Sequence, residues 1–257
     1  MNQENDFSRR ELLALGGVGA VLVSPFRHLP WWEPKEVSIA GARFEIVRSK
    51  LKHQPSRRRY VLIHGDEQTA RELLLKHMQT HSGIAFAVES QTRNIPIEAG
   101  QIDPNRMFSR RGATVSLESL NPKWTPAQVD AALDLLDRER EPFLDTILPT
   151  EGALMVALHN NKEYSFSEEA PASDQNTQNQ PNDLHAFFLC TDPADYKLLA
   201  ASPFNVVLQQ YMRAPDDGSL SRRAAARRLR YLNLEVKAGD DARQQEMLDW
   251  VEKNLPE

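Results

Sequence analysis

Residues 59–67 are RYVLIHGDE, a short apolar run that ends in a histidine, a glycine and two acidic residues. Such a run, closed by a turn, is typical of a strand buried in the middle of a sheet. Leucine and methionine then recur with helical spacing over 69–81, and 84–88 is again apolar and strand-like. The order strand, helix, strand indicates an α/β fold.

The rest of the chain continues this alternation. Apolar and polar residues alternate over 37–47 around Ala40-Gly41, which predicts a hairpin. A capping box at 125–128 begins a helix that we expect to run to about residue 140. We expect the remaining elements to be strands at 153–158, 186–190, 204–208 and 232–236, and helices at 193–201, 221–228 and 241–254. The pattern predicts an α/β domain with helices on both faces of a mixed sheet.

Composition excludes several classes of protein. Of the 257 residues, 40% are hydrophobic and 26% are charged, which is ordinary for a globular domain and unlike a collagen-like, disulfide-framework or disordered chain. The net charge of −5 argues against nucleic-acid binding, which needs a basic face to neutralise phosphates. The single cysteine, Cys190, cannot form an intramolecular disulfide, and we expect a buried apolar residue rather than a nucleophile.

The N-terminus has features of an export signal. Arg9 and Arg10 precede an uncharged apolar stretch over 12–23, and Pro25 follows it. The stretch is too short to span a bilayer, which takes about 20 apolar residues. We therefore interpret residues 1–28 as a twin-arginine-type signal segment, which predicts export by the twin-arginine machinery to the periplasm or another extracytoplasmic compartment. Because no clear cleavage site follows, the segment would either be cut imperfectly or remain as an N-terminal membrane tether, and an ordinary amphipathic helix is the alternative.

Residues 29–257 are expected to form one catalytic α/β domain. Within it, 167–183 (SEEAPASDQNTQNQPND) is polar and nearly free of apolar side chains, so it cannot bury enough surface to fold alone. We predict a mobile loop inside the domain, because strands follow it. A linker between two domains is the alternative.

Histidine and glutamate side chains follow the buried strands. His64 and Glu67 form an H-x-x-E pair after the strand at 59–63, and His159 follows the apolar run at 153–158, ahead of two asparagines that suit a turn. Ligand sites of open α/β sheets lie at the carboxyl ends of strands, so the three side chains are expected to converge. Two imidazoles and a carboxylate suit zinc, which in catalytic sites takes three protein ligands and keeps one position for water. Taken singly, each of these residues is more often a chance occurrence or a structural residue.

Two further segments carry polar residues of interest. Asn105 and Arg106 lie in IDPNRMF (102–108), where an amide and a guanidinium would grip a carboxylate through bidentate hydrogen bonds. The alternative there is a common turn with an exposed arginine. Glu235 lies in the strand-like YLNLEV (231–236) and would either face solvent or serve a site as a general base.

Together these motifs resemble those of the zinc carboxypeptidase family. They occur in the family's order: His64-x-x-Glu67, Asn105-Arg106, His159 and Glu235. HGDE and DPNRMF are also similar to the H-G-N-E and D-L-N-R-x-F motifs of the aspartoacylase and succinylglutamate desuccinylase branch. The resemblance spans 61–239 and implies a mixed, largely parallel sheet of about eight strands between helices.

The resemblance also implies an activity and its residues. It assigns zinc binding to His64, Glu67 and His159, substrate-carboxylate binding to Asn105 and Arg106, general base and acid catalysis to Glu235, and polarisation of the scissile carbonyl to Arg93. The implied enzyme is a zinc metallopeptidase, a carboxypeptidase-like hydrolase that cleaves an amide bond next to a terminal carboxylate-bearing residue of peptides, cell-wall peptides included. The alternatives are an N-acyl amino acid deacylase and a catalytically inactive binding protein on the same fold.

The chain departs from the family at two places. Ala157 stands two residues before His159, where the family often has aspartate, so this histidine needs a partner from elsewhere. The substrate-capping tyrosine of the family has no clear counterpart, and Tyr211 is the candidate we name.

Other polar clusters are interpreted as surface features. His77 and His81 are spaced by one helical turn but lack the glutamate of a zincin motif, so we expect both on the surface. Arg57–Arg59 and Arg222–Arg230 lie in an acidic chain without interleaved aromatic residues, and solvated faces are expected rather than nucleic-acid sites. No feature of the sequence indicates an oligomeric state.

Overall fold

Nine strands form one mixed sheet in the computed structural model, which describes residues 37–49, 51, 56–211 and 213–257. Their order across the sheet is β1-β2-β4-β3-β7-β11-β9-β10-β8. The bounds are Val37–Ile39 for β1, Ala42–Arg48 for β2, Arg59–Leu62 for β3, Ile84–Val88 for β4, Met155–Asn161 for β7, Gln175–Thr177 for β8, Phe187–Cys190 for β9, Asn205–Leu208 for β10 and Tyr231–Lys237 for β11.

The centre of the sheet is parallel. Strands β4, β3, β7 and β11 pair in parallel, as do β9 and β10, whereas β1–β2, β2–β4, β9–β11 and β8–β10 are antiparallel pairs. The predicted α/β architecture with a mixed sheet is confirmed. The sheet has nine strands rather than about eight, and the short edge strand β8 arises from the polar segment 167–183.

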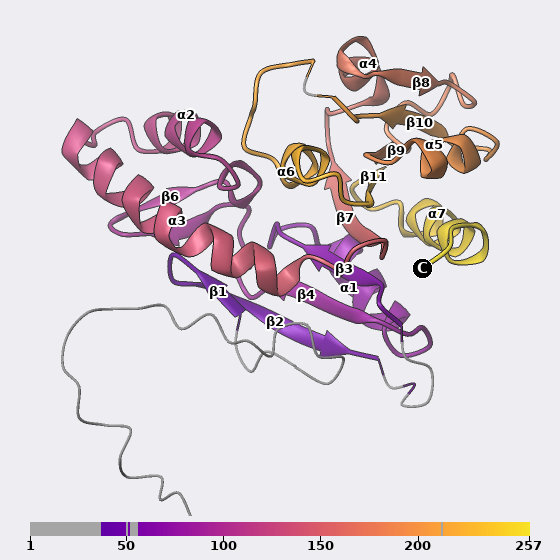
Figure 1. The fold of residues 1–257 in the computed structure, drawn as a ribbon, viewed down its shortest axis with the longest axis horizontal. Coiled ribbons are helices and arrows are strands. Elements are labelled where there is room, and N and C mark those ends of the chain that lie inside the picture. Colours follow the sequence, from indigo (N-terminus) through magenta and orange to yellow (C-terminus); the bar gives the residue numbers. More distant parts are fainter. Residues whose placement is uncertain (1–36, 50, 52–55, 212) are drawn as a thin grey trace, which may run out of the picture. The chain divides into compact units, whose positions relative to one another are not determined.

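Helices cover both faces of this sheet (Figure 1). Tyr60 and Leu62 of β3 pack in one core cluster with residues of α1 (Gln68–His77), α5 (Pro193–Leu199) and α7 (Asp241–Asn254). The neighbouring Val61 and Ile63 pack in a second cluster with residues of α2 (Arg110–Leu120), α3 (Pro126–Ile147) and α6 (Leu220–Ala226). Side chains of a strand alternate between faces, so both faces of β3 are buried and its sequence is a nearly continuous apolar run.

Turn and cap residues place several elements as predicted. Ala40 and Gly41 both have positive φ and join β1 to β2, and Thr125 and Gln128 form the capping box that begins α3. The predicted end of α3 near residue 140 is wrong, because the helix continues past Pro142 to Ile147. A proline inside a helix removes a hydrogen bond, but the residues beyond it include buried core positions that hold the last turns in place.

The polar segment 167–183 contains secondary structure: the end of α4 (Phe166–Glu169), the 3-10 turn Ala170–Ala172 and β8. Its polar side chains bind backbone groups of neighbouring loops. The Asn179 amide donates to the carbonyls of Ala200, Ser202 and Phe204, and the Asp174 carboxylate accepts from the backbone N–H groups of Gln210 and Tyr211 at 2.7 Å. Hydrogen bonds, rather than burial of apolar side chains, thus hold this segment against the neighbouring loops. Its mobility stays a prediction.

All described residues belong to one unit of the chain, Pro34–Glu257. The predicted signal segment, residues 1–28, lies outside the described residues, and its role in export stays a prediction. Among the residues that the structure describes, no helix combines the length and apolar character needed to cross a bilayer.

His77 and Arg58 are both buried, which contradicts the expectation that they lie on the surface. His77 Nε2 lies 3.2 Å from the Tyr60 hydroxyl and 3.3 Å from Glu252. Arg58 Nη1 lies 2.6 Å from the same carboxylate of α7, and the Tyr60 hydroxyl donates to it at 2.8 Å. The sequence pattern missed this cluster because Glu252 comes from the far end of the chain.

We expect Glu252→Gln to destabilise the protein in a pH-dependent manner. Burial disfavours the charged carboxylate, but the hydrogen bond from His77 and the charge of Arg58 outweigh burial and lower the pKa of Glu252 from 4.5 to about 2. A carboxylate whose pKa is lower in the folded than in the unfolded state stabilises the fold at any pH above its unfolded pKa. This stabilisation is lost as the pH falls from about 4.5 to about 2. The substitution should lower the free energy of unfolding by about 3 kcal/mol at pH 7.

Urea unfolding of both proteins between pH 7 and pH 3 measures this difference, which should narrow below pH 4.5. Glu246→Gln is the matched control on the same helix, because Glu246 is exposed and surface ion pairs contribute little. A difference that stays constant down to pH 3 would contradict the assignment.

A candidate metal centre and its cavity

Two histidines and a glutamate converge beside the central strands. His64 follows β3, Glu67 is the N-cap residue of α1 and His159 lies in β7. His64 Nδ1 is 2.8 Å from Glu67 Oε1, and His159 Nδ1 is 3.3 Å from Glu67 Oε2. All three residues are buried, and one ligand atom from each lies within 4.8 Å of the others. The convergence expected from the sequence is therefore present, although Asn160 and Asn161 continue β7 instead of forming a turn.

The three groups perturb each other electrostatically. Burial disfavours the imidazolium of His64, but hydrogen bonds to Asp103 and Glu67 outweigh it and raise the pKa of His64 to about 9. Burial likewise disfavours the Glu67 carboxylate, yet the nearby His159 and His64 lower the pKa of Glu67 to about 2. A buried carboxylate held in its charged form beside two imidazoles is suited to a cation.

The cluster fits a zinc ion by its chemistry. Glu67 Oε2, which faces His159 Nδ1, is buried without a hydrogen-bond partner in the described part of the chain. His64 Nε2 lies 2.9 Å from Asp103 Oδ1, so with a metal bound Asp103 would hold the proton on Nε2 and leave Nδ1, which faces Glu67, as the ligand atom. Two histidines and one glutamate are a known donor set of catalytic zinc. The cluster can hold a metal ion.

Glu235 lies beside the cluster on β11. It is the direct register partner of His159 on the parallel strand β7, and it is buried, so it does not face solvent. The Asn161 amide donates to Oε2 at 3.2 Å and the Asn233 amide to Oε1 at 3.0 Å. Burial and the charge of Glu67 raise the pKa of Glu235 against the opposing effects of His159 and the two amides. A carboxylate of raised pKa is suited to accept and return a proton.

The seven residues to which the resemblance assigns a metal, carboxylate, carbonyl or proton-transfer role line one cavity of about 420 Å³. They are His64, Glu67, Arg93, Asn105, Arg106, His159 and Glu235. Arg93 is exposed, and its guanidinium reaches to 3.7 Å from Glu67 and 3.5 Å from Asp103. The cavity therefore holds candidate groups for metal binding, proton transfer and binding of an anion, which is what the sequence motifs predicted as a set.

Asn105 and Arg106 lie on the 3-10 turn Pro104–Arg106, which follows the small hairpin of β5 (Ile95–Ile97) and β6 (Gly100–Ile102). Asn105 Oδ1 accepts from the Leu220 backbone at 3.0 Å, so this side chain also ties the turn to α6. Arg106 Nη1 donates to the Asn105 carbonyl and to Asp217 Oδ2 at 3.0 and 3.1 Å. Within the described residues, the other N–H groups of Arg106 remain available to a ligand in the cavity.

Several lining or supporting residues were missed by the sequence analysis. Asp103 belongs to the IDPNRMF motif, but the sequence analysis gave it no role. Its contact with His64 arises only from the fold. Asn161 and Asn233 lie two residues from His159 and Glu235, and alternation along a strand could have placed them on the same face. Tyr211 is exposed and does not line the cavity, whereas Tyr164 does.

No protein-family model matches the chain, and a comparison with curated proteins finds no match. The assignment of a function therefore depends on the geometry and chemistry of this cavity.

Proposed function

We propose that the protein is a zinc-dependent hydrolase of the carboxypeptidase-like type, which cleaves an amide bond next to a terminal residue with a free carboxylate. The observation that carries this proposal is that the buried His64–Glu67–His159 cluster shares one cavity with Glu235 and Arg106. Metal ligands, a buried carboxylate and a guanidinium in one cavity are the groups that such a reaction needs.

His64, Glu67 and His159 would hold the zinc ion, with His64 oriented by Asp103. When bound, zinc supplies Lewis acidity, which polarises a carbonyl and makes a neighbouring water molecule more acidic.

Glu235 is the proposed general base and acid. Its carboxylate would take a proton from the attacking water and deliver that proton to the leaving amine. The water oxygen forms a bond to the carbonyl carbon while the carbon–nitrogen bond breaks, so the amide and water give a carboxylic acid and an amine. The amides of Asn161 and Asn233 hold the carboxylate in position for both transfers.

Arg93 would stabilise the negative charge that develops on the carbonyl oxygen. Its guanidinium lies at the edge of the metal cluster, and it is only loosely engaged by Glu67 and Asp103 at 3.5 Å or more. A cationic donor at this place lowers the energy of the transition state more than that of the bound substrate.

Arg106 should make a free terminal carboxylate a requirement of the reaction. We expect the zinc-loaded protein to release the last residue of blocked dipeptides with a free carboxyl terminus, and not of the same peptides with an amidated terminus. In Arg106→Met, kcat/KM for the free acid should fall about 10- to 100-fold, because a charge-assisted hydrogen bond contributes about 1.5–3 kcal/mol.

Chromatographic detection of the released residue measures both rates. Arg110→Met is the matched control, because Arg110 is exposed and pairs with acids of α3. Equal cleavage of free and amidated substrates would refute the role of Arg106, and absence of cleavage from every blocked peptide and acyl amino acid would refute the proposed hydrolase.

A further inference from the structure

Gln244 is a fully buried polar residue of α7, with 0% of its surface exposed. The other buried residues of this helix are apolar: Met247, Leu248 and Val251. The Gln244 amide is engaged on both sides, because Nε2 donates to the His159 carbonyl at 3.0 Å and Oε1 accepts from Asn160 Nδ2 at 3.1 Å. A buried amide costs free energy unless it is hydrogen-bonded, so these two contacts with β7 account for a polar residue at this position.

Gln244 contacts β7 where the sheet holds this strand on one side only. The pairing of β7 with β11 continues to Asn161, whereas its pairing with β3 ends at Ala157. His159, a candidate metal ligand, lies two residues beyond that point. The hydrogen bond from Gln244 therefore holds the backbone of the ligand itself where β3 no longer does.

The contact continues through Asn160 to the helix that carries a second ligand. Asn160 Oδ1 accepts from the Ala70 backbone N–H at 2.8 Å. Ala70 is the third residue of α1, and Glu67 is the N-cap residue of this helix. An N-cap side chain ordinarily accepts from the N–H of the second or third helical residue.

The Glu67 carboxylate does not cap its own helix. It faces His64 and His159 instead, at 2.8 and 3.3 Å. Asn160 supplies the acceptor that the N-terminus of α1 would otherwise lack. The Glu67 carboxylate is thus available to a metal ion without leaving this N–H group of the helix unpaired.

We propose that Gln244 and Asn160 are positioning residues of the metal centre. Asn160 caps α1 in place of Glu67, and Gln244 fixes both Asn160 and the His159 backbone. Together they set the separation between the ligand of α1 and the ligand of β7, and thereby the affinity for zinc. This inference rests on the metal centre of the proposed function and specifies which residues outside the centre determine its affinity.

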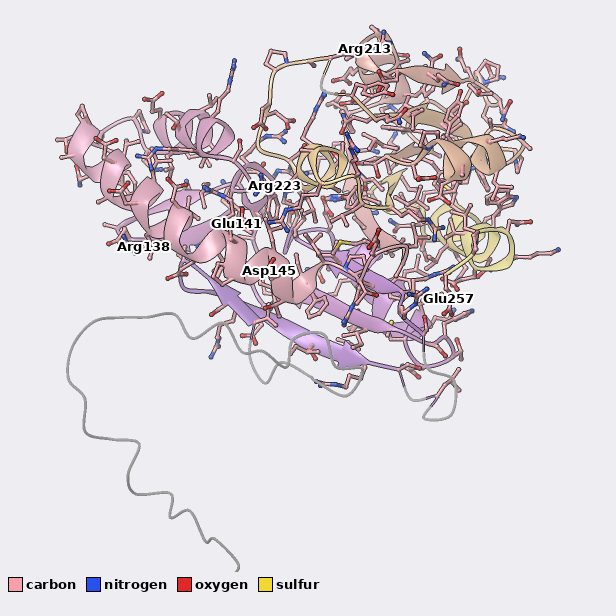
Figure 2. All side chains as sticks on the ribbon, viewed as in Figure 1. Arg138, Glu141, Asp145, Arg213, Arg223 and Glu257 are labelled. Atoms are coloured by element: carbon pink, nitrogen blue, oxygen red, sulfur yellow. The ribbon has the colours of Figure 1, made fainter. Side chains whose placement is uncertain are left out.

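The end of α7 is anchored independently of Gln244. Arg58 Nη2 donates to the Leu255 carbonyl at 2.9 Å, and Arg230 Nη1 donates to the carbonyl of Glu257, which is labelled in Figure 2, at 3.1 Å. Loss of the Gln244 amide should therefore leave the helix docked on the sheet, so that its effect on the metal centre can be measured.

The test is the zinc affinity of Gln244→Met, measured by competition with a chelator. Methionine has a similar length and volume but makes neither hydrogen bond, so zinc affinity should fall about 10- to 100-fold. Gln245→Met is the matched control, because Gln245 donates to Asp249 on the exposed side of the same helix, and it should bind zinc as the wild type does. Glu252→Gln destabilises the fold from the other end of α7 and should also keep wild-type affinity.

Asn160→Leu interrupts the same contacts from the strand side and removes the cap of α1. It should lower zinc affinity at least as much as Gln244→Met, and it gives the same comparison if Gln244→Met does not fold. Wild-type affinity in either folded variant would show a purely structural role and overturn the proposal. An equal fall in affinity in Glu252→Gln would also overturn it, because affinity would then follow overall stability.

These affinities are measured without substrate, which separates the inference from the proposed function. If Gln244→Met binds zinc weakly while the wild type cleaves no peptide or acyl amino acid, the positioning role stands and the hydrolase assignment fails. If Gln244→Met binds zinc as tightly as the wild type, the positioning role is refuted even when the enzyme cleaves peptides.

Discussion

Replacing His159 with alanine is expected to abolish tight zinc binding and all hydrolysis. The cluster offers three protein ligands, and His159 is one of its two nitrogen donors. With two ligands left, the site cannot fill the coordination sphere that zinc adopts in proteins. Zinc content after dialysis, measured by atomic spectrometry, should fall from about one ion per wild-type chain to background in the variant.

Graded and matched controls make this result specific. Asp103→Asn keeps all three ligands but weakens the orientation of His64, so zinc affinity should fall about 10- to 100-fold in chelator competition. His81→Ala removes a histidine that stacks on His77 and lies outside the cluster, and it should bind zinc normally. Zinc should also raise the melting temperature of the wild type and not of His159→Ala. Full zinc content in His159→Ala would refute the centre.

The parts of the site that the sequence could predict are those governed by strand ends. His64 and Glu67 follow a strand whose apolar run is unambiguous, and the same reasoning brought His159 to the same edge of the sheet. The order of the strands was not predictable in detail, because pairing depends on contacts between residues far apart in the chain. The strand order is needed to predict that Glu235 lies opposite His159. Their strands, β11 and β7, are neighbours in the sheet although β8, β9 and β10 lie between them in sequence.

Burial of individual polar residues was the least predictable property. Arg58 and Arg222 were assigned to the surface because their arginine runs lie in an acidic chain without interleaved aromatic residues, and His77 because it lacks the glutamate of a zincin motif. Each is buried by a partner from a distant element: Glu252 of α7 for the first two, and Gln209 at the end of β10 for Arg222. Charge patterns along the chain report the average exposure of a segment and do not report which member of an arginine run turns inward.

Glu235→Gln is expected to lower kcat by about 10²- to 10⁴-fold and to leave zinc content unchanged, the range that general acid–base catalysis contributes. The substitution preserves the shape of the side chain and removes its ability to take a proton. Asn161 Oδ1 and Asn233 Oδ1 are buried without hydrogen-bond partners in the described part of the chain, so a rotated asparagine amide can accept the new N–H group. The fold should therefore tolerate the change, and a melting curve checks this.

Steady-state kinetics on a blocked dipeptide then separate catalysis from binding. KM should change by no more than a few-fold, because substrate affinity is assigned to Arg106, whereas loss of a group that acts only in the transition state appears in kcat. Glu118→Gln, an exposed acid on α2, is the matched control and should keep wild-type kinetics. A Glu235→Gln enzyme with near-normal kcat and full zinc would show that another group moves the proton, and the register pairing of Glu235 with His159 would then serve only to organise the two strands.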